Sequence, residues 1–339
     1  MNIPMISICS IEFYVCNAPM RMPFRFGSTT LTASAVLHVR MEIQIGNCGR
    51  FEGWSADMIA PKWFEKSDDK SYRQCLDELL AVAQNAATTY KDLGKRPIRF
   101  FDLWLQAHRI AKVWSRTNKV NDLMGSNGPS LMERALIDAV GIYSGLTYHE
   151  MLANNILGID FKAIHNELDV MSVKDVISKR PVESLEIRHT VGLVDPLLDQ
   201  DIDEEFRIND GLPQSLESYI REQGIRYFKI KIGGDSYTDF ERLRDICGLL
   251  DSRCQNYYVT LDGNEQYNNV DVLVGLLEMI NENINTSYLS PKIISASGLC
   301  NLKLLENSIV AKPIELQTDD GVSELKTISI LSEIFIPSS

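Results

Sequence analysis

Strand and helix patterns alternate in the second half of the chain, and this limits the folds that the sequence can adopt. Runs rich in β-branched and aromatic residues at 185–193, 227–232 and 256–262 indicate strands, and apolar residues at helical spacing occur at 240–250 and 270–280. The repeat is roughly 25–30 residues from the second strand onward, the size of a βα unit. Such alternation places parallel strands in one sheet, so we expect an α/β fold, either a barrel or an open doubly wound sheet. The first strand is not followed by a GxGxxG motif, which argues against a dinucleotide-binding fold.

The first half of the chain has its strands first and its helices afterwards. Strands are expected at 6–16 and 35–45, a third short strand ends at Gly53–Ala56, and the Pro- and Gly-containing segment 20–30 between the first two is expected to be a loop. Amphipathic helices are expected at 68–93, 98–116 and 131–143, the last opened by a capping box of Ser130 and Glu133 and ended by Gly145. This order is typical of an α+β domain. We therefore expect one domain over 1–160 and a second over 161–339, with the junction between Gly158 and Pro181.

Charge and composition exclude some classes of partner. The formal net charge is -12, which disfavours binding to nucleic acid and to anionic membranes. No apolar run of about 18 residues is present, and the first ten residues lack the pattern of a signal peptide. The seven cysteines are scattered without CxxC spacing, so we expect reduced thiols in a cytoplasmic protein.

Polar residues on two of the expected parallel strands carry the chemistry. Lys229 and Lys231 share one face of the strand at 227–232, and Asp262 and Asn264 share one face at the end of the strand at 256–262. In barrels, sites are built at the carboxyl ends of strands, and a carboxylate beside basic groups suits a hard cation such as Mg²⁺. Two simpler interpretations stay open here. The lysines could belong to a solvated edge strand, and Asp262-Gly-Asn could be only a turn.

These residues resemble the enolase superfamily, in its mandelate racemase and muconate lactonizing branch. The motifs are Phe228-Lys-Ile-Lys-Ile-Gly-Gly and Thr260-Leu-Asp-Gly-Asn-Glu-Gln-Tyr in the second half. Pro23-Phe-Arg-Phe-Gly-Ser, Gly53-Trp-Ser-Ala and Glu133-Arg-Ala-Leu-Ile-Asp-Ala resemble its capping domain. The resemblance implies an α+β capping domain followed by a (β/α) TIM-type barrel, here incomplete, with about five βα units.

The resemblance also implies a reaction and a role for each residue. Such enzymes bind a small carboxylate to Mg²⁺ and remove the proton α to it, in racemase, dehydratase or cycloisomerase reactions. Asp262 would be a metal ligand that Asn264 supports, Lys231 the general base, and Lys229 the group that lowers the pKa of Lys231 and steadies the carboxylate. Loops would close over the substrate and contribute Phe24, Phe26, Trp54 and Ser55.

The sequence departs from the family pattern after the third barrel strand. Weaker strand patterns occur at 286–289 and 313–317, and the acidic ligands expected near 288 and 317 are replaced by Leu289-Ser-Pro and Gln317-Thr. Glu315, Asp319 or Asp320 could substitute only with a shifted register. The remaining length also falls short of the roughly 250 residues of a TIM barrel.

These departures leave several interpretations open. The alternative to an Mg²⁺-dependent isomerase or lyase is a truncated, inactive family member without the full metal site. A third is a Schiff-base aldolase that uses Lys231, for which the sequence supplies no partner residues. His189 is either a substrate contact or a packed histidine, and Glu265 either a pocket acid or a solvated turn residue. An open sheet edge favours self-association into a homo-oligomer.

Overall fold

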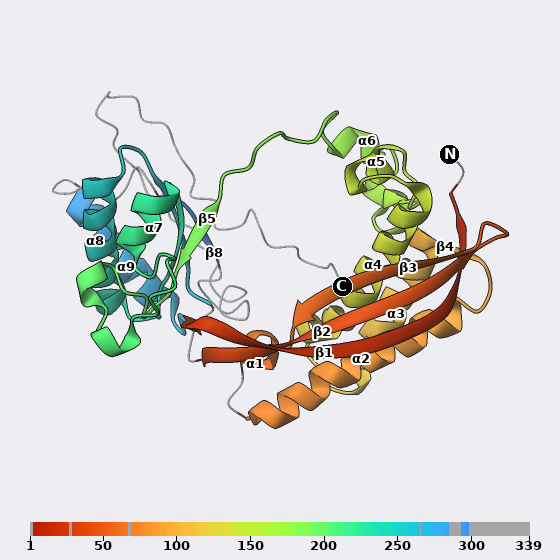
Figure 1. Ribbon diagram of the computed structural model, residues 1–339, viewed down its shortest axis with the longest axis horizontal. Helices are drawn as coiled ribbons and strands as arrows, with labels where there is room; N and C mark the ends of the chain where they lie inside the picture. Colours follow the sequence, from red (N-terminus) through yellow and green to blue (C-terminus); the bar gives the residue numbers. More distant parts are fainter. Residues whose placement is uncertain (1–2, 27–28, 67–68, 265, 285–292, 298–339) are drawn as a thin grey trace. The chain divides into compact units, whose positions relative to one another are not determined.

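The computed structural model describes residues 3–26, 29–66, 69–264, 266–284 and 293–297 (Figure 1). The chain divides into two compact units. One consists of Met1–Arg21 and Thr32–Glu183, and the other of Met22–Leu31 and Ser184–Ser339. The expected boundary between 160 and 161 falls inside the first unit. There the helices α5 (Tyr148–Ala153) and α6 (Val173–Val176) contact each other, and His149 Nε2 lies 2.9 Å from the carbonyl oxygen of Ser178. Within the described ranges, no helix is long and apolar enough to cross a membrane.

An antiparallel sheet of four strands in the order β3-β2-β1-β4 lies in the first unit, apart from the residues of β1 and β2 within Met22–Leu31. Its strands are β1 (Met5–Phe26), β2 (Thr29–Ile45), β3 (Arg50–Met58) and β4 (Ile98–Arg99). Alternate residues of β2 are buried, namely Leu37, Val39, Met41, Ile43 and Ile45, as the period-2 pattern predicts.

The expected loop at 20–30 is wrong for most of its length, because β1 continues to Phe26 and β2 begins at Thr29. The short strand β4 pairs only with Met5 and Ile6, so the rest of β1 has one side without a partner among the described strands. A strand with such a side tolerates the missing N–H of Pro23. The proline therefore did not mark the end of the strand.

Helices cover one face of this sheet (Figure 1). They are α1 (Pro61–Phe64), α2 (Tyr72–Leu93), α3 (Phe100–Thr117), α4 (Asp122–Ser144), α5 (Tyr148–Ala153) and α6 (Val173–Val176), with short 3₁₀ turns η1 (Phe161–Ala163) and η2 (Asn166–Leu168). The predicted start of the third long helix at Ser130 is wrong. Asn121 caps α4 by accepting a hydrogen bond from the Met124 amide at 2.8 Å. Gly128, inside α4, allows close packing, since a Cβ on it would lie 2.5 Å from the carbonyl oxygen of Val82 in α2.

Strand β3 packs directly on helix α4. A Cβ on Gly53 would lie 2.2 Å from the carbonyl oxygen of Ala135 and 2.3 Å from the nitrogen of Ala139, so only glycine allows this approach. The Trp54 amide donates to the Asp138 carboxylate at 2.8 Å, and Ser55 Oγ donates to the Leu131 carbonyl at 2.7 Å. Two of the three capping-domain motifs of the sequence, Gly53–Ala56 and Glu133–Ala139, therefore pack against each other.

The second unit contains a parallel sheet with the strand order β5-β6-β7-β8. The strands are β5 (Arg188–Val191), β6 (Tyr227–Lys231), β7 (Tyr258–Asp262) and β8 (Ile293–Ser297). Its helices are α7 (Leu216–Gln223), α8 (Ser236–Arg253) and α9 (Val270–Ile284), with 3₁₀ turns η3 (Asp199–Asp201) and η4 (Glu204–Phe206) in the first connection. Phe228 and Ile230 of β6 and Val259 and Leu261 of β7 form one apolar core with these helices.

Two expected strands need comment. The strand that pairs with β7 is Ile293–Ser297, so the fourth place in the sheet is not taken by 286–289. Residues 286–289 and the fifth candidate, 313–317, lie outside the described residues.

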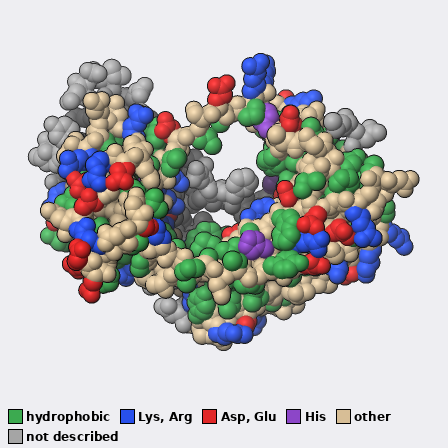
Figure 2. All heavy atoms as spheres, in the orientation of Figure 1, with side chains coloured by type: hydrophobic (Ala, Val, Ile, Leu, Met, Phe, Trp, Pro, Cys, Tyr) green, Lys and Arg blue, Asp and Glu red, His purple; other side chains and the backbone are tan. Residues whose placement is uncertain are grey.

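Acidic and basic side chains are mixed over the face of the molecule seen in Figure 2. Many of them form surface ion pairs, such as Arg134–Asp57 at 2.8 Å and Lys162–Asp169 at 2.7 Å. Exposed pairs of this kind each contribute about 0–1 kcal/mol, so the stability of both units comes mainly from their apolar cores.

Candidate functional site

Parallel pairing of β6 and β7 brings the predicted polar residues together. In the register of the two strands, Lys229 lies beside Thr260 and Lys231 beside Asp262. Side chains that are paired in register point to the same face of a sheet. Lys229, Lys231 and Asp262 therefore lie on the face opposite Phe228 and Ile230, toward the carboxyl ends of the strands.

The side chains of this cluster are joined by short hydrogen bonds and ion pairs. Lys229 Nζ and Lys231 Nζ each lie 2.6 Å from Oδ2 of Asp262. Lys231 Nζ also donates to Oδ1 of Asn264 at 2.6 Å, and the Asn264 amide donates to Oδ1 of Asp262 at 3.0 Å. Both oxygens of the Asp262 carboxylate are therefore occupied by donors from the chain itself.

Asn264 has the backbone conformation of a turn as well as a place in the cluster. Its φ is 45°, in the left-handed region, which asparagine adopts more readily than most residues. Gly263 precedes it. The turn interpretation of Asp262-Gly-Asn is thus correct, and the same turn aims the Asn264 amide oxygen at Lys231.

Burial separates the members of the cluster. The side chains of Lys231 and Asp262 are 7% and 8% exposed, whereas that of Lys229 is 26% exposed. Burial is the largest influence on Asp262 and would raise its pKa, but hydrogen bonds from Lys229, Lys231 and the Asn264 amide outweigh it, so the pKa of Asp262 lies below its ordinary value. Asp262 is therefore a charged carboxylate at neutral pH, and Lys229 is the more accessible cation.

A further cation reaches this face from β5 and was missed by the sequence analysis. Arg188 is paired with Tyr227, which lies on the same face of β6 as Lys229 and Lys231; we call this face of the sheet the lysine face. Nη1 of Arg188 lies 3.5 Å from Oγ1 of Thr260, across β6. Thr190, paired with Lys229, adds a hydroxyl-bearing residue to the same face. The alternation of β5 could have revealed both residues if the register between β5 and β6 had been known.

His189 lies on the other face of the sheet. It is paired with Phe228, and its ring lies 4.3 Å from that of Tyr219 in α7, measured between ring centroids. Burial lowers the pKa of His189, partly offset by the charge of Asp195. Of the two interpretations of this residue, the packed histidine matches its position, and His189 is not part of the lysine cluster.

The four residues expected in substrate-closing loops lie within strands. Phe24 is half-buried in β1, and Phe26 is the last residue of that strand. Trp54 and Ser55 are in the middle of β3, paired with Arg40 and Val39 of β2. The Trp54 ring lies 5.6 Å from that of Tyr14, and its Nε1 donates to Glu52 at 2.6 Å. The prediction of a mobile loop at Gly53–Ser55 is therefore wrong, because backbone pairing and α4 hold this segment.

The described residues do not fit Mg²⁺. In the part of the chain that the structure describes, no three His, Cys, Asp or Glu residues are grouped as metal ligands. Asp262 is the one carboxylate of the cluster, and two ammonium groups already contact the oxygen that a metal would need. The residue paired with Asp262 on β8 is Ser297, which supplies no carboxylate, and the ligand position expected near 288 lies outside the described residues. Glu265, Glu315, Asp319 and Asp320 lie outside the described residues.

Loops around the cluster are fixed by a buried carboxylate. Asp239, in the first turn of α8, is 4% exposed and accepts hydrogen bonds from the amides of Gly233 and Gly234 at 2.7 and 2.9 Å. It also accepts one from Tyr267 Oη at 2.6 Å. Asp239 therefore joins the loop after Lys231 to the loop after Asn264.

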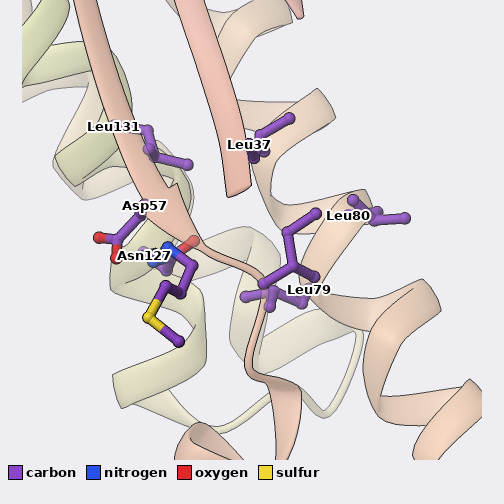
Figure 3. Close-up of a pocket in the computed structure, with 8 residues that line it drawn as sticks. Leu37, Asp57, Leu79, Leu80, Asn127 and Leu131 are labelled. Atoms are coloured by element: carbon purple, nitrogen blue, oxygen red, sulfur yellow. Dashed lines mark hydrogen bonds between the residues drawn. The ribbon is translucent and has the colours of Figure 1, made fainter. Parts of the chain in front are cut away.

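Two cavities lie away from the cluster and are lined by none of its residues. One of about 10 Å³ lies in the first unit among Leu37, Leu79, Leu80 and Leu131 (Figure 3), with room for about one water molecule. A larger hollow of about 480 Å³ is lined by the segment 194–206, Gln214 and Arg242. Its Asp195 and Asp201 accept hydrogen bonds from backbone amides of their own loop, at 2.7 and 2.9 Å, so we assign these carboxylates to loop structure.

Comparison with known proteins finds similarity in three dimensions. No family model and no curated protein match the chain. An L-Ala-D/L-Glu epimerase of Bacillus subtilis, in complex with substrate, has a TM-score of 0.55 and 15% identity over 88% of this chain and 63% of that chain. A Bradyrhizobium protein described as an enolase, in complex with magnesium and mandelic acid, has a TM-score of 0.53 and 14% identity over 90% and 66%. A mandelate racemase/muconate lactonizing protein of Herpetosiphon aurantiacus has a TM-score of 0.52 and 15% identity over 87% and 61%.

These similarities concern the fold. The chain spans between 61% and 66% of the length of the three structures. They confirm the predicted architecture, an α+β capping domain followed by part of a (β/α)-barrel.

Proposed function

Because the chain has the fold of the enolase superfamily, in its mandelate racemase and muconate lactonizing branch, we propose that it binds a small carboxylate at the cluster of Lys229, Lys231, Asp262 and Asn264. We propose further that this site supports removal of the proton α to the bound carboxylate. The observation that carries the proposal is that both lysines meet on one buried carboxylate at the carboxyl ends of adjacent parallel strands.

The two lysines have different positions, which supports different roles. Lys229 is the more exposed and is placed to bind the incoming carboxylate as an ammonium ion. Lys231 is nearly buried and is the proposed base, which must first lose its own proton to solvent water. The Cα–H bond then breaks, the proton moves to Nζ of Lys231, and the electron pair remains on an enediolate that the positive charge of Lys229 stabilises. Lys229 favours the neutral form of Lys231 by repulsion, while Asp262 opposes this.

No step of this proposal passes through Mg²⁺, since the described residues do not fit the ion. Mg²⁺ remains a prediction from the resemblance, with Glu315 or Asp319 as possible further ligands. The class of reaction (racemase, dehydratase or cycloisomerase) is also a proposal that rests on the resemblance. A cytoplasmic location and self-association of the chain are further proposals from the sequence.

A second candidate function is carboxylate binding without turnover. It is favoured by the occupation of both Asp262 oxygens and by the serine at 297, where the pairing of β7 and β8 would place the next ligand. An enediolate is a costly intermediate without strong positive charge beside it, so a site of this composition can bind more readily than it can react.

Exchange of α-protons in D₂O separates the two candidates. Mandelate and the dipeptide L-Ala-L-Glu are incubated with the purified chain, with and without MgCl₂, and their α-proton signals are followed by ¹H NMR. The first candidate predicts loss of the signal for at least one compound, and no loss with Lys231→Met. Lys179→Met, at an exposed position near the end of the first unit, is the matched control. Binding without exchange of any α-proton would favour the second candidate.

A further inference from the structure

The charges of the lysine face are opposite in sign to those of the whole molecule. Arg188, Lys229 and Lys231 supply three positive charges and Asp262 one negative charge, so the local sum is 3 − 1 = +2, while the chain as a whole carries -12. A locally positive face on an acidic protein attracts small anions to one place.

The contacts of Asp262 also favour an anion over a metal ion. A magnesium ion needs carboxylate oxygens at about 2.0–2.1 Å and near-octahedral geometry. To reach Oδ2 of Asp262 it would have to displace two ammonium groups that lie 2.6 Å from that oxygen. A carboxylate ligand meets no such barrier, because it adds acceptors beside donors.

We infer that this face binds its carboxylate ligand directly through Lys229 and Arg188, without a divalent cation. The inference rests on the proposed function and gives its site a mode of recognition that differs from the metal-bound carboxylate implied by the resemblance. Lys229 offers the accessible ammonium, and the planar guanidinium of Arg188 can hold a carboxylate through two parallel hydrogen bonds.

Asp262 has opposite effects in the two modes of binding. In a metal site it is the anchor, and Asp262→Asn abolishes binding of metal and ligand together. In the direct mode the Asp262 carboxylate competes with the ligand for Lys229 and Lys231. Asp262→Asn then leaves an additional positive charge for the ligand, and we expect binding to tighten about three- to tenfold.

The test uses succinate as the probe and its uncharged analogue succinamide as the control, titrated into the full chain by calorimetry at constant ionic strength. One series contains excess EDTA and the other excess MgCl₂. We expect dissociation constants that agree within about twofold, no binding of succinamide, and at least about tenfold weaker binding with Lys229→Met or Arg188→Met. Lys179→Met is the control for loss of a surface charge.

The outcomes separate this inference from the proposed function. Binding that requires MgCl₂ overturns the inference and leaves the proposed carboxylate site intact. Absence of binding in both series overturns both. Weaker binding with Asp262→Asn also overturns the inference, provided that circular dichroism shows the variant to be folded. The comparison of EDTA with MgCl₂ uses the unmodified chain and does not depend on that variant.

Discussion

Asp262 is the residue on which the lysine cluster depends, because two cations share its buried carboxylate. Removing one partner of a buried ion pair leaves a charge without compensation, which costs about 3–5 kcal/mol. Asp262→Ala should therefore destabilise the second unit by about that amount. Lys229→Met should cost less, about 1 kcal/mol or below, because Lys229 is partly exposed and Lys231 still pairs with Asp262.

Hydrogen exchange with mass spectrometry measures this difference in peptides that cover 227–262. Fluorescence cannot replace it, since all four tryptophans lie in the first unit. Equal protection in Asp262→Ala and Lys229→Met would contradict a stabilising role for the shared carboxylate.

Glu133 makes the stability of the first unit depend on pH. Burial raises its pKa, and a hydrogen bond with Trp104 and the charge of Arg134 offset this only in part. The folded state therefore binds the proton more tightly than the unfolded state, and this contribution to stability is lost as pH rises above the ordinary value of 4.5. Glutamine stays neutral at every pH, so Glu133→Gln should abolish this fall in the free energy of unfolding. The variant should therefore be more stable than the unmodified chain at neutral pH.

Urea unfolding followed by tryptophan fluorescence at several pH values tests this prediction. Glu167→Gln, at an exposed position, is the matched control and should leave the pH dependence unchanged. A pH dependence that is the same in both variants would show that Glu133 does not cause it.

At the scale of elements, the approach of β3 to α4 depends on Gly53. Gly53→Ala would place a methyl group 2.2 Å from one backbone atom of α4 and 2.3 Å from another, neither of which can move alone. We expect a loss of about 1–3 kcal/mol or more from the first unit. Gly248→Ala, in α8, meets no atom within 4 Å and should instead stabilise its helix by about 0.5–1 kcal/mol.

Urea unfolding of both glycine variants provides the comparison, with fluorescence for the first unit and far-UV circular dichroism for the helices. A neutral effect of Gly53→Ala would mean that β3 and α4 can separate without cost.

The loop after β6 depends on Asp239 in α8. Asp239→Asn replaces a charged acceptor of three hydrogen bonds with a neutral side chain, and each hydrogen bond to a charged group contributes about 1.5–3 kcal/mol. We expect faster amide exchange at Gly233 and Gly234, measured by NMR. Asp235→Asn, which changes only the cap of the same helix, should leave these two amides protected.

At the scale of the whole molecule, the boundary between the two units can be located by proteolysis. Residues 178–188 are exposed and precede or begin β5, so brief treatment with trypsin should cleave after Lys179, whereas Pro181 blocks cleavage after Arg180. A domain boundary at 160 would favour cleavage after Lys162 instead. Mass spectrometry of the fragments distinguishes the two positions, and early cleavage at Lys162 would contradict the division after Glu183.

The sequence by itself determined features that depend on local periodicity. The alternation along 227–232 and 256–262 placed Lys229, Lys231 and Asp262 on polar faces, because successive side chains of a strand point to opposite sides regardless of context. The apolar face of β2 and the ends of α2 and α3 were predictable to within a few residues for the same reason. Motif order then pointed to the fold that the comparisons confirm.

Only the tertiary structure decided which residues meet. Arg188 joins the lysine face and His189 leaves it because of the pairing of β5 with β6, and Ser297 is paired with Asp262 because of the register of β8. Helix α4 begins before Ser130, and Gly128 within it packs closely against α2. Trp54 and Ser55 lie in a strand that Gly53 allows to pack closely against α4. Register and close packing arise between residues far apart in the chain, and periodicity within one segment contains no information about them.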